Sequence, residues 1–324
     1  MALSLFARAV LGCTLAFAAA AALAQAFPVK PVRIIVSATA GGFMDLIARG
    51  LAPELSRAWD QPVLVENRAG ANGIVATEAV VRSAPDGHSL LLSTSSLATN
   101  EFLYNSLPYD TAKDLTPVVG IAATSMLLVA SASVNADSLA QLIELAKQKP
   151  GSFNYGSFGI GNIVSHIDME ALASLAGIKL THIPFKGVPD VSQALMSGDV
   201  QIAMFGVAAA VPQIRSGKLK AIALAAPQRL NVIRNVPTFA ESGIPFESRG
   251  WYGFVVRAGV SRGVMDTIAR DVIRIASGNE YQKKYFTALG IEPMVLDTEQ
   301  FAALVKSERA TYAVRIRNVG IKLD

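Results

Sequence analysis

The stretch from Val32 to Leu55 constrains the fold most, because an apolar strand runs through a small-residue loop straight into an amphipathic helix. Arg33 to Val36 is typical of a buried strand, and apolar residues recur at helical spacing after the loop Ala40-Gly41-Gly42. A helix that begins directly after two glycines has unpaired backbone N–H groups at its N-terminus. These groups and the positive end of the helix dipole face the space beyond the end of the strand, where an anion could bind. The stretch therefore predicts either an anion-binding loop or an ordinary turn whose glycines serve only geometry.

The alternation of strand and helix continues along the chain and predicts a parallel α/β architecture. Between two such runs, a longer apolar strand pair at 118–121 and 126–129 is a candidate crossing between domains. The other predicted strands lie at 62–67, 89–93, 153–155, 180–184, 200–205, 219–224, 251–256 and 293–296. Helices are predicted between these strands, at 262–277 and 280–289, and from Thr298 onward.

Residues 1–26 have the features of a secretory leader, with one basic residue, Arg8, and an apolar run that ends in Ala24-Gln25-Ala26. We expect cleavage after Ala26 and export of a soluble protein. A membrane anchor is less favoured because the run ends at a cleavage pattern. A lipoprotein signal at Cys13 is less favoured because a long Ala/Leu stretch still follows this cysteine.

Composition excludes several classes of function. Cys13 is the only cysteine and leaves with the leader, so the mature chain has no disulfide and no thiol nucleophile. The chain has 29 Lys and Arg against 25 Asp and Glu, and the basic residues are scattered, which gives no indication of nucleic-acid binding. The three histidines lack metal-ligand spacing, so we expect no metal. We also expect no cofactor. Of the histidines, His88 is predicted to be exposed and His182 half-buried.

A second glycine loop, Tyr155 to Asn162, also follows a strand and precedes a helix. Its spacing is G-x-x-G-x-G, so it is neither a dinucleotide fingerprint nor a Walker motif. Two such loops at the carboxyl ends of strands predict a cleft whose two walls both favour an anion. His166, at the start of the following helix, is a candidate either to donate to the anion or to hold the loop.

Asp45 in the first helical turn allows two interpretations. It is either an acid that caps free amides and complements the helix dipole, or a side chain that faces the cleft. No G-x-S-x-G elbow and no paired acids occur, so a hydrolase is not supported.

With these loops and several further motifs, the chain resembles the Bug-type extracytoplasmic solute receptors of tripartite tricarboxylate transporters. The resemblance runs from about Phe27 to the C-terminus. It is carried by Phe27-Pro28-x-Lys30-Pro31-Val32-Arg33, Ala40-Gly41-Gly42-x-x-Asp45, Pro62-Val63-x-Val65-Glu66-Asn67-Arg68-x-Gly70-Ala71, Ala84-Pro85-Asp86-Gly87, Leu107-Pro108-Tyr109-Asp110, Asn154-Tyr155-Gly156-Ser157, His182-Ile183-Pro184-Phe185-Lys186-Gly187, Gly217-Lys218-Leu219 and Val236-Pro237-Thr238.

The resemblance implies a type II periplasmic-binding-protein fold, with two α/β domains and a ligand cleft between them. Domain 1 is expected at 27–127 and 250–324, and domain 2 at 128–249. The loops that would grip a carboxylate are Thr39, Ala40, Gly41 and Gly42 with Asp45, and Ser157, Phe158, Gly159, Ile160, Gly161 and Asn162 with His166. Ser95, in the polar loop after the strand at 89–93, is a further candidate.

The chain departs from the family pattern at Ser37-Ala38, at Asn162, and near Phe205, where the family commonly has an Asp. The identity of the acid is therefore open. Four phenylalanines near the motif loops favour a ligand with an apolar or aromatic body, although core packing explains them as well: Phe43, Phe158, Phe185 and Phe205.

We therefore predict a periplasmic, monomeric, non-enzymatic receptor that binds a small organic acid and presents it to membrane permease subunits. Two alternatives remain. One is a solute sensor for a signalling partner, and the other is an enzyme that acts in the same cleft, with Asp45 and His166 as its only candidate groups.

Overall fold

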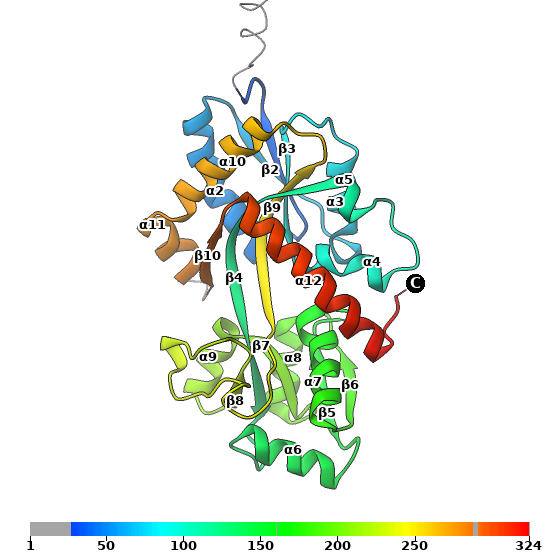
Figure 1. Cartoon of the computed structure of the whole chain (residues 1–324). Helices are drawn as coiled ribbons and strands as arrows, with labels where there is room; N and C mark the ends of the chain where they lie inside the picture. The colour runs from blue at the N-terminus through cyan, green and yellow to red at the C-terminus, as the bar shows by residue number, and fades with distance from the viewer. Residues whose placement is uncertain (1–26, 160, 288–290, 324) are drawn as a thin grey trace, which may run out of the picture.

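The structure, a computed structural model, describes residues 27–159, 161–287 and 291–323. It has two α/β lobes joined by long strands, as Figure 1 shows. The predicted leader at 1–26, with its cleavage after Ala26, lies outside the described residues, as does Ile160 of the second glycine loop.

The first lobe follows the predicted alternation of strand and helix. Its parallel strands lie in the order β2 (Val63–Asn67), β1 (Val32–Val36) and β3 (Ser89–Thr94), and β3 pairs antiparallel with β9 (Arg249–Arg257). Helices α2 (Phe43–Trp59) and α10 (Arg262–Ala276) pack on one face, and α3 (Ile74–Val81) on the other. Short helices complete the lobe: α4 (Asn100–Leu103), α5 (Thr111–Asp114) and α11 (Asn279–Tyr281).

The predicted strand pair at 118–121 and 126–129 is one continuous strand, β4 (Leu115–Ser131). Its first part pairs with β9 as far as Ser125 opposite Arg249, and its second part pairs with β7 (Ile202–Gly206) and β8 (Leu219–Leu224). The prediction of two strands was wrong because the intervening small residues stay extended while β9 supplies their pairing partners. β4 therefore runs from one lobe into the other (Figure 1).

The second lobe repeats the pattern, and its predicted strands are confirmed. β5 (Phe153–Ser157) pairs in parallel with β6 (Leu180–Pro184) and with β7. Its helices are α6 (Leu139–Gln148), α7 (Asp168–Ala176), α8 (Val188–Ser197) and α9 (Val207–Arg215), and a π-helical turn at Ile163–Ile167 leads into α7.

The terminal helix α12 (Thr298–Val319) runs diagonally from the first lobe toward the second (Figure 1). It begins with a capping box between Asp297 and Gln300 and follows β10 (Glu292–Leu296), which pairs with β4. Its buried face packs on both lobes, because Phe301 lies in a first-lobe core and Tyr312 belongs to one apolar cluster with Ile163 and Ile167 of the second lobe.

Each lobe has its own apolar core. Fully buried Ile34 and Phe254 lie in the first, and fully buried Tyr155 and Met204 lie in the second. The expected domain boundaries after 127 and 249 fall inside β4 and β9, the two strands at the crossing, and stay a prediction.

Candidate functional site

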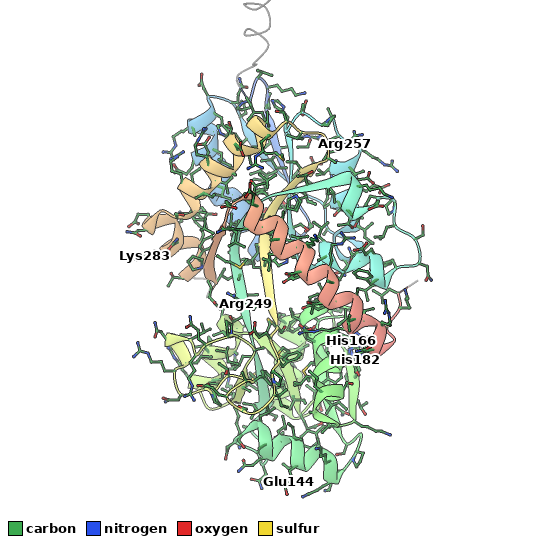
Figure 2. All side chains as sticks on the ribbon, viewed as in Figure 1. Glu144, His166, His182, Arg249, Arg257 and Lys283 are labelled. Atoms are coloured by element: carbon green, nitrogen blue, oxygen red, sulfur yellow. The ribbon has the colours of Figure 1, made fainter. Side chains whose placement is uncertain are left out.

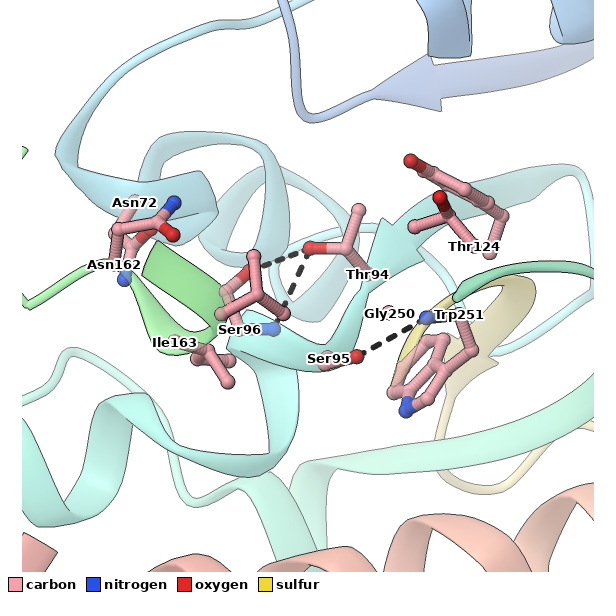
Figure 3. Close-up of a pocket in the computed structure, with 11 residues that line it drawn as sticks. Asn72, Thr94, Ser95, Ser96, Thr124, Asn162, Ile163, Gly250 and Trp251 are labelled. Carbon is pink, nitrogen blue, oxygen red and sulfur yellow. Dashed lines mark hydrogen bonds between the residues drawn. The ribbon is translucent and has the colours of Figure 1, made fainter. Parts of the chain in front are cut away.

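A cavity of about 170 Å³, lined by both polar and apolar residues, lies between the lobes. The first lobe contributes Asn72, Thr94, Ser95 and Ser96, the second lobe contributes Asn162, Ile163 and Val164, and the crossing strands contribute Thr124, Gly250, Trp251 and Tyr252 (Figure 3). The cavity therefore lies beyond the carboxyl ends of β3 and β5, where open α/β sheets bind their ligands.

The first-lobe wall is held by its own hydroxyl groups. Thr94 Oγ1 lies 2.9 Å from Ser96 Oγ, and Ser95 Oγ accepts the backbone N–H of Trp251 at 3.1 Å (Figure 3). Asn72 Nδ2 donates to Asn100 Oδ1 at 3.0 Å, which leaves Asn72 Oδ1 without a donor from the described residues. Ser95, a predicted site residue, thus lines the cavity and joins the segment after β3 to β9.

Asn162 forms the second-lobe wall and keeps a free donor. Its Oδ1 accepts from Ser165 N at 3.1 Å and from Ser165 Oγ at 2.8 Å, which caps the following turn. Its Nδ2 has no acceptor among the described residues, so the side chain can offer two N–H donors to a ligand.

Two hydroxyl groups on the crossing strands also lack a partner among the described residues: Thr124 on β4 and Tyr252 on β9. Burial raises the pKa of Tyr252 to about 12, so its hydroxyl is a neutral donor at physiological pH. The Tyr252 ring packs on Phe43, with ring centroids 4.8 Å apart.

Among the described residues that line the cavity there is no Lys, Arg, Asp or Glu. An anion there would be held by neutral hydroxyl and amide donors. Such donors can hold a buried carboxylate only if they satisfy its oxygens with several hydrogen bonds.

The predicted first loop lies beside the cavity, and none of its six predicted site residues lines it. Gly41 N donates to Asp45 Oδ2 at 2.8 Å, and Gly42 N donates to Thr39 O at 3.3 Å. Arg49 Nε donates to Asp45 Oδ1 at 2.9 Å, and this hydrogen bond is the main reason that the pKa of Asp45 is lowered. In this structure Asp45 therefore accepts the Gly41 amide. Direct ligand contact by Thr39, Ala40, Gly41, Gly42, Phe43 or Asp45 stays a prediction.

The amides of the second loop also have partners within the loop and its helix. Phe158 N donates to Ser165 Oγ at 3.0 Å, Gly159 N donates to Ser157 Oγ at 3.3 Å, and Gly161 N donates to His166 Nδ1 at 2.9 Å. Of the predicted residues of this loop, the structure places Asn162 in the cavity wall. For the others, a ligand contact stays a prediction.

His166 holds the second loop together with His182. The two rings stack at 3.8 Å, and His182 Nε2 lies 2.6 Å from Ser157 Oγ (Figure 2). Burial, with His182 as a second cause, lowers the pKa of His166 to about 4. His166 is therefore neutral at physiological pH, and its Nδ1 is an acceptor for Gly161 rather than a donor to an anion.

The other predicted aromatic residues pack against one another in the second lobe. Phe205 is fully buried and lies 5.4 Å from the ring of Phe158, and Phe185 packs against the same cluster. None of the three lines the cavity. Core packing accounts for Phe205.

His88 was predicted to be exposed, and this prediction was wrong. It is only 8% exposed, because Phe27 packs on its ring at 5.0 Å and Val29 N donates to its Nε2 at 3.2 Å. The half-buried position of His182 is confirmed.

Sequence reasoning missed Asn72, Thr124 and Tyr252 as site residues. Two weak signals were present in the sequence: a polar Thr124 inside an apolar strand, and the pair Asn72-Gly73, which is typical of turns. In the structure Asn72 has a φ of +53°. Nothing in the sequence distinguished Tyr252 from a packed strand tyrosine.

Two α/β lobes crossed by long strands, with a cavity between them that carries uncharged polar side chains, define a two-domain solute-binding protein. The sequence matches the family described as tripartite tricarboxylate transporter family receptor over residues 47–321, and the chain belongs to that family. Protein BugT of Bordetella pertussis is 33% identical over 320 residues, which cover 97% of this chain and 98% of that protein.

Solved structures of similar proteins have the same fold. R. palustris Rpa4515 with adipate has a TM-score of 0.79 at 27% identity, covering 91% of this chain and 99% of that chain. MatC from Rhodopseudomonas palustris with bound malate has a TM-score of 0.74 at 29% identity, covering 90% and 100%. The predicted family and the type II periplasmic-binding-protein fold are confirmed.

Within residues 27–159, 161–287 and 291–323, no helix is long and apolar enough to cross a membrane. In the same ranges, no group of three or more His, Cys, Asp or Glu side chains could hold a metal ion.

Proposed function

We propose that this chain is a periplasmic receptor that captures a small organic carboxylate in the cavity between its lobes and presents it to the permease subunits of a tripartite transporter. The observation that carries the proposal is the cavity wall, which has polar side chains from both lobes and from the crossing strands and, among the described residues, no charged side chain. Export through the leader cut after Ala26, and a monomeric receptor without catalytic activity, are parts of the same proposal.

The lining favours a small acid. A cavity of about 170 Å³ is below the range of drug-sized ligand pockets. The free Asn162 amide, Thr124 hydroxyl and Tyr252 hydroxyl are three separate donors. This number suits an acid that has a second carboxylate or a hydroxyl group beside the first carboxylate. Two similar proteins were solved with the dicarboxylates adipate and malate, which supports the same ligand class here.

Ligand binding would stabilise the closed arrangement of the lobes. A ligand shifts a conformational equilibrium only through contacts that differ between the two states. An acid held by Asn162 on one lobe and by Thr94 or Ser96 on the other makes such contacts only when the lobes are together.

The test is thermal denaturation of the mature protein with a panel of carboxylic acids, because a ligand that binds only the folded state raises the midpoint. Any acid that raises it is then recovered and analysed. Unchanged acid supports a receptor, whereas chemical turnover would contradict one. A panel without any shift would contradict carboxylate binding.

The site is tested by Asn162→Asp. Aspartate keeps the oxygen that caps the turn but replaces the Nδ2 donor with negative charge. We expect affinity for the acid to fall about 10- to 100-fold or more, the value of a hydrogen bond to a charged group. The matched control Asn231→Asp, an exposed site away from the cavity, should leave affinity unchanged. If Asn162→Asp and Asn231→Asp bind the acid with equal affinity, the acid does not bind at Asn162.

A further inference from the structure

Trp251 lies between two cavities. The ligand cavity and a second cavity of about 370 Å³ on the α12 side are both lined by Gly250 and Trp251. The backbone N–H of Trp251 donates to Ser95 in the wall of the ligand cavity, while its indole points toward α12 (Figure 3). The two cavities thus share one segment of β9.

The Trp251 indole is anchored by α12. Its Nε1–H donates to Glu308 Oε2, and its ring packs edge-on against Phe301 at 5.0 Å. Trp251 is 1% exposed, so these contacts fix its position. Gly250 and Tyr252, which flank Trp251 in β9, also line the ligand cavity. By holding the Trp251 indole, Glu308 therefore fixes the position of this part of the cavity wall.

Glu308 occupies an unusual position on its helix. It lies on the inward side of α12 with the buried residues Phe301, Val305, Tyr312 and Ile316, while Glu308 itself is half-buried and lines the second cavity. An ionised carboxylate is costly on such a face. Burial raises the pKa of Glu308 to about 8.

Charged and titratable groups face Glu308 from each packed element. Asp168 on α7, Arg315 on α12 and Arg249 on β9 act electrostatically on its carboxyl group. Glu247, just before β9, and Tyr312 on α12 line the second cavity together with Glu308, and Glu292 on β10 reaches this group through Arg249. Arg315 pairs with Asp168 at 2.6 Å, and Arg249 pairs with Glu292 at 3.4 Å. Both arginines are therefore shared with other carboxylates, which leaves Glu308 without a dedicated cationic partner.

We propose that Glu308 is a positioning residue for the ligand site, and that binding of an anion in the cavity is coupled to uptake of a proton by its carboxyl group. The inference rests on the proposed function. An anion in front of β9 increases the cost of a negative Glu308 behind it, so the bound state favours the protonated carboxyl. By linkage, protonation of Glu308 favours the bound anion by the same factor.

The sign of the pH effect follows from this coupling. Well below pH 8, Glu308 is already protonated in the free protein, and affinity is independent of pH. As the pH rises through 8, Glu308 is ionised in the free protein and must take up a proton from the solvent when the anion binds, so affinity falls. A change of about fivefold or more is the usual size of such a coupling.

The experiment is calorimetric titration with malate and adipate between pH 6.5 and 9.5, in two buffers of different ionisation enthalpy. The full mature chain should take up protons on binding near pH 8. Glu308→Gln keeps an acceptor for the Trp251 indole but cannot titrate, so its affinity should be flat with pH. Glu299→Gln, an exposed change on the same helix, should behave as the parent.

Tryptophan emission of the ligand-free proteins gives an independent measurement. The parent and Glu308→Gln both contain Trp59, so the difference between their emission spectra reports Trp251. The difference should appear with a midpoint near pH 8. Its absence would overturn the proposal, because Glu308 would not titrate against Trp251.

The outcomes separate the two hypotheses. If an acid binds and Glu308→Gln retains the parent's pH dependence, the coupling is overturned and the receptor function stands. If neither malate nor adipate nor any other acid of the panel binds at any pH, the receptor proposal fails and the coupling fails with it.

Discussion

At the residue scale, the second glycine loop depends on an unprotonated His166. Its Nδ1 accepts the Gly161 amide, and a proton on that nitrogen would break the bond. Because burial lowers the pKa of His166 to about 4, the unfolded chain takes up this proton at a higher pH than the folded protein does. The loop is thus stable at neutral pH and sensitive to acid.

We therefore expect the free energy of unfolding to decrease as the pH falls from about 6.5 toward 4. Urea unfolding at pH 7, 5.5 and 4.5 measures it. His166→Phe should be less stable at pH 7, because Gly161 loses its acceptor, but should lose less with acid than the parent. An identical loss in both proteins would show that His166 does not carry the effect.

At the element scale, a buried carboxylate joins three segments. Asp168, at the start of α7, is fully buried and accepts from Arg315 at 2.6 Å and from Tyr312 at 3.1 Å, both on α12. It also accepts from Ser248, which precedes β9. The Arg315 guanidinium lies over the rings of Phe246 and Tyr312. This cluster ties the second lobe to the terminal helix.

Asp168→Ala should lower the free energy of unfolding by about 3–5 kcal/mol, the cost of leaving one partner of a buried ion pair alone. Urea unfolding at pH 7 measures the change. Asp266→Ala, which removes an exposed partner of Arg262, should leave stability nearly unchanged. Equal, small effects of both substitutions would contradict a structural role for the cluster.

At the scale of the whole molecule, the two lobes should respond to ligand together. The cavity takes its wall from both, and the lobes also meet in an apolar cluster of Leu103, Ile167 and Ile316. A ligand that bridges the lobes stabilises only the arrangement in which both contacts exist.

Amide hydrogen exchange with and without a bound acid tests this response. Amide exchange should slow in residues 94–98 of the first lobe and in residues 161–167 of the second lobe. Both segments should reach half of their protection at the same ligand concentration. α6, at the end of the second lobe away from the cavity, is the internal control and should not change (Figure 1). Protection confined to one lobe would contradict closure around the ligand.

The sequence by itself determined the order of the elements and the class of the protein. Strands such as β1 and β3 are short apolar runs bounded by turn residues, and α12 shows its capping box and its apolar spacing in consecutive residues. These are local patterns, so they can be read before folding. The continuous β4 was predicted as two strands because the pairing that keeps its middle extended comes from β9, which lies over a hundred residues away in the chain.

Only the tertiary structure decided which polar groups face the ligand cavity. The amides of Gly41 and Gly161 are free in the sequence pattern, yet Asp45 and His166 occupy them. Conversely, Tyr252 lines the cavity because β9 crosses between the lobes there. A hydrogen-bonding group is available only if no neighbour in space satisfies it. Those neighbours are set by packing, because the side chains that meet there come from segments far apart in the chain.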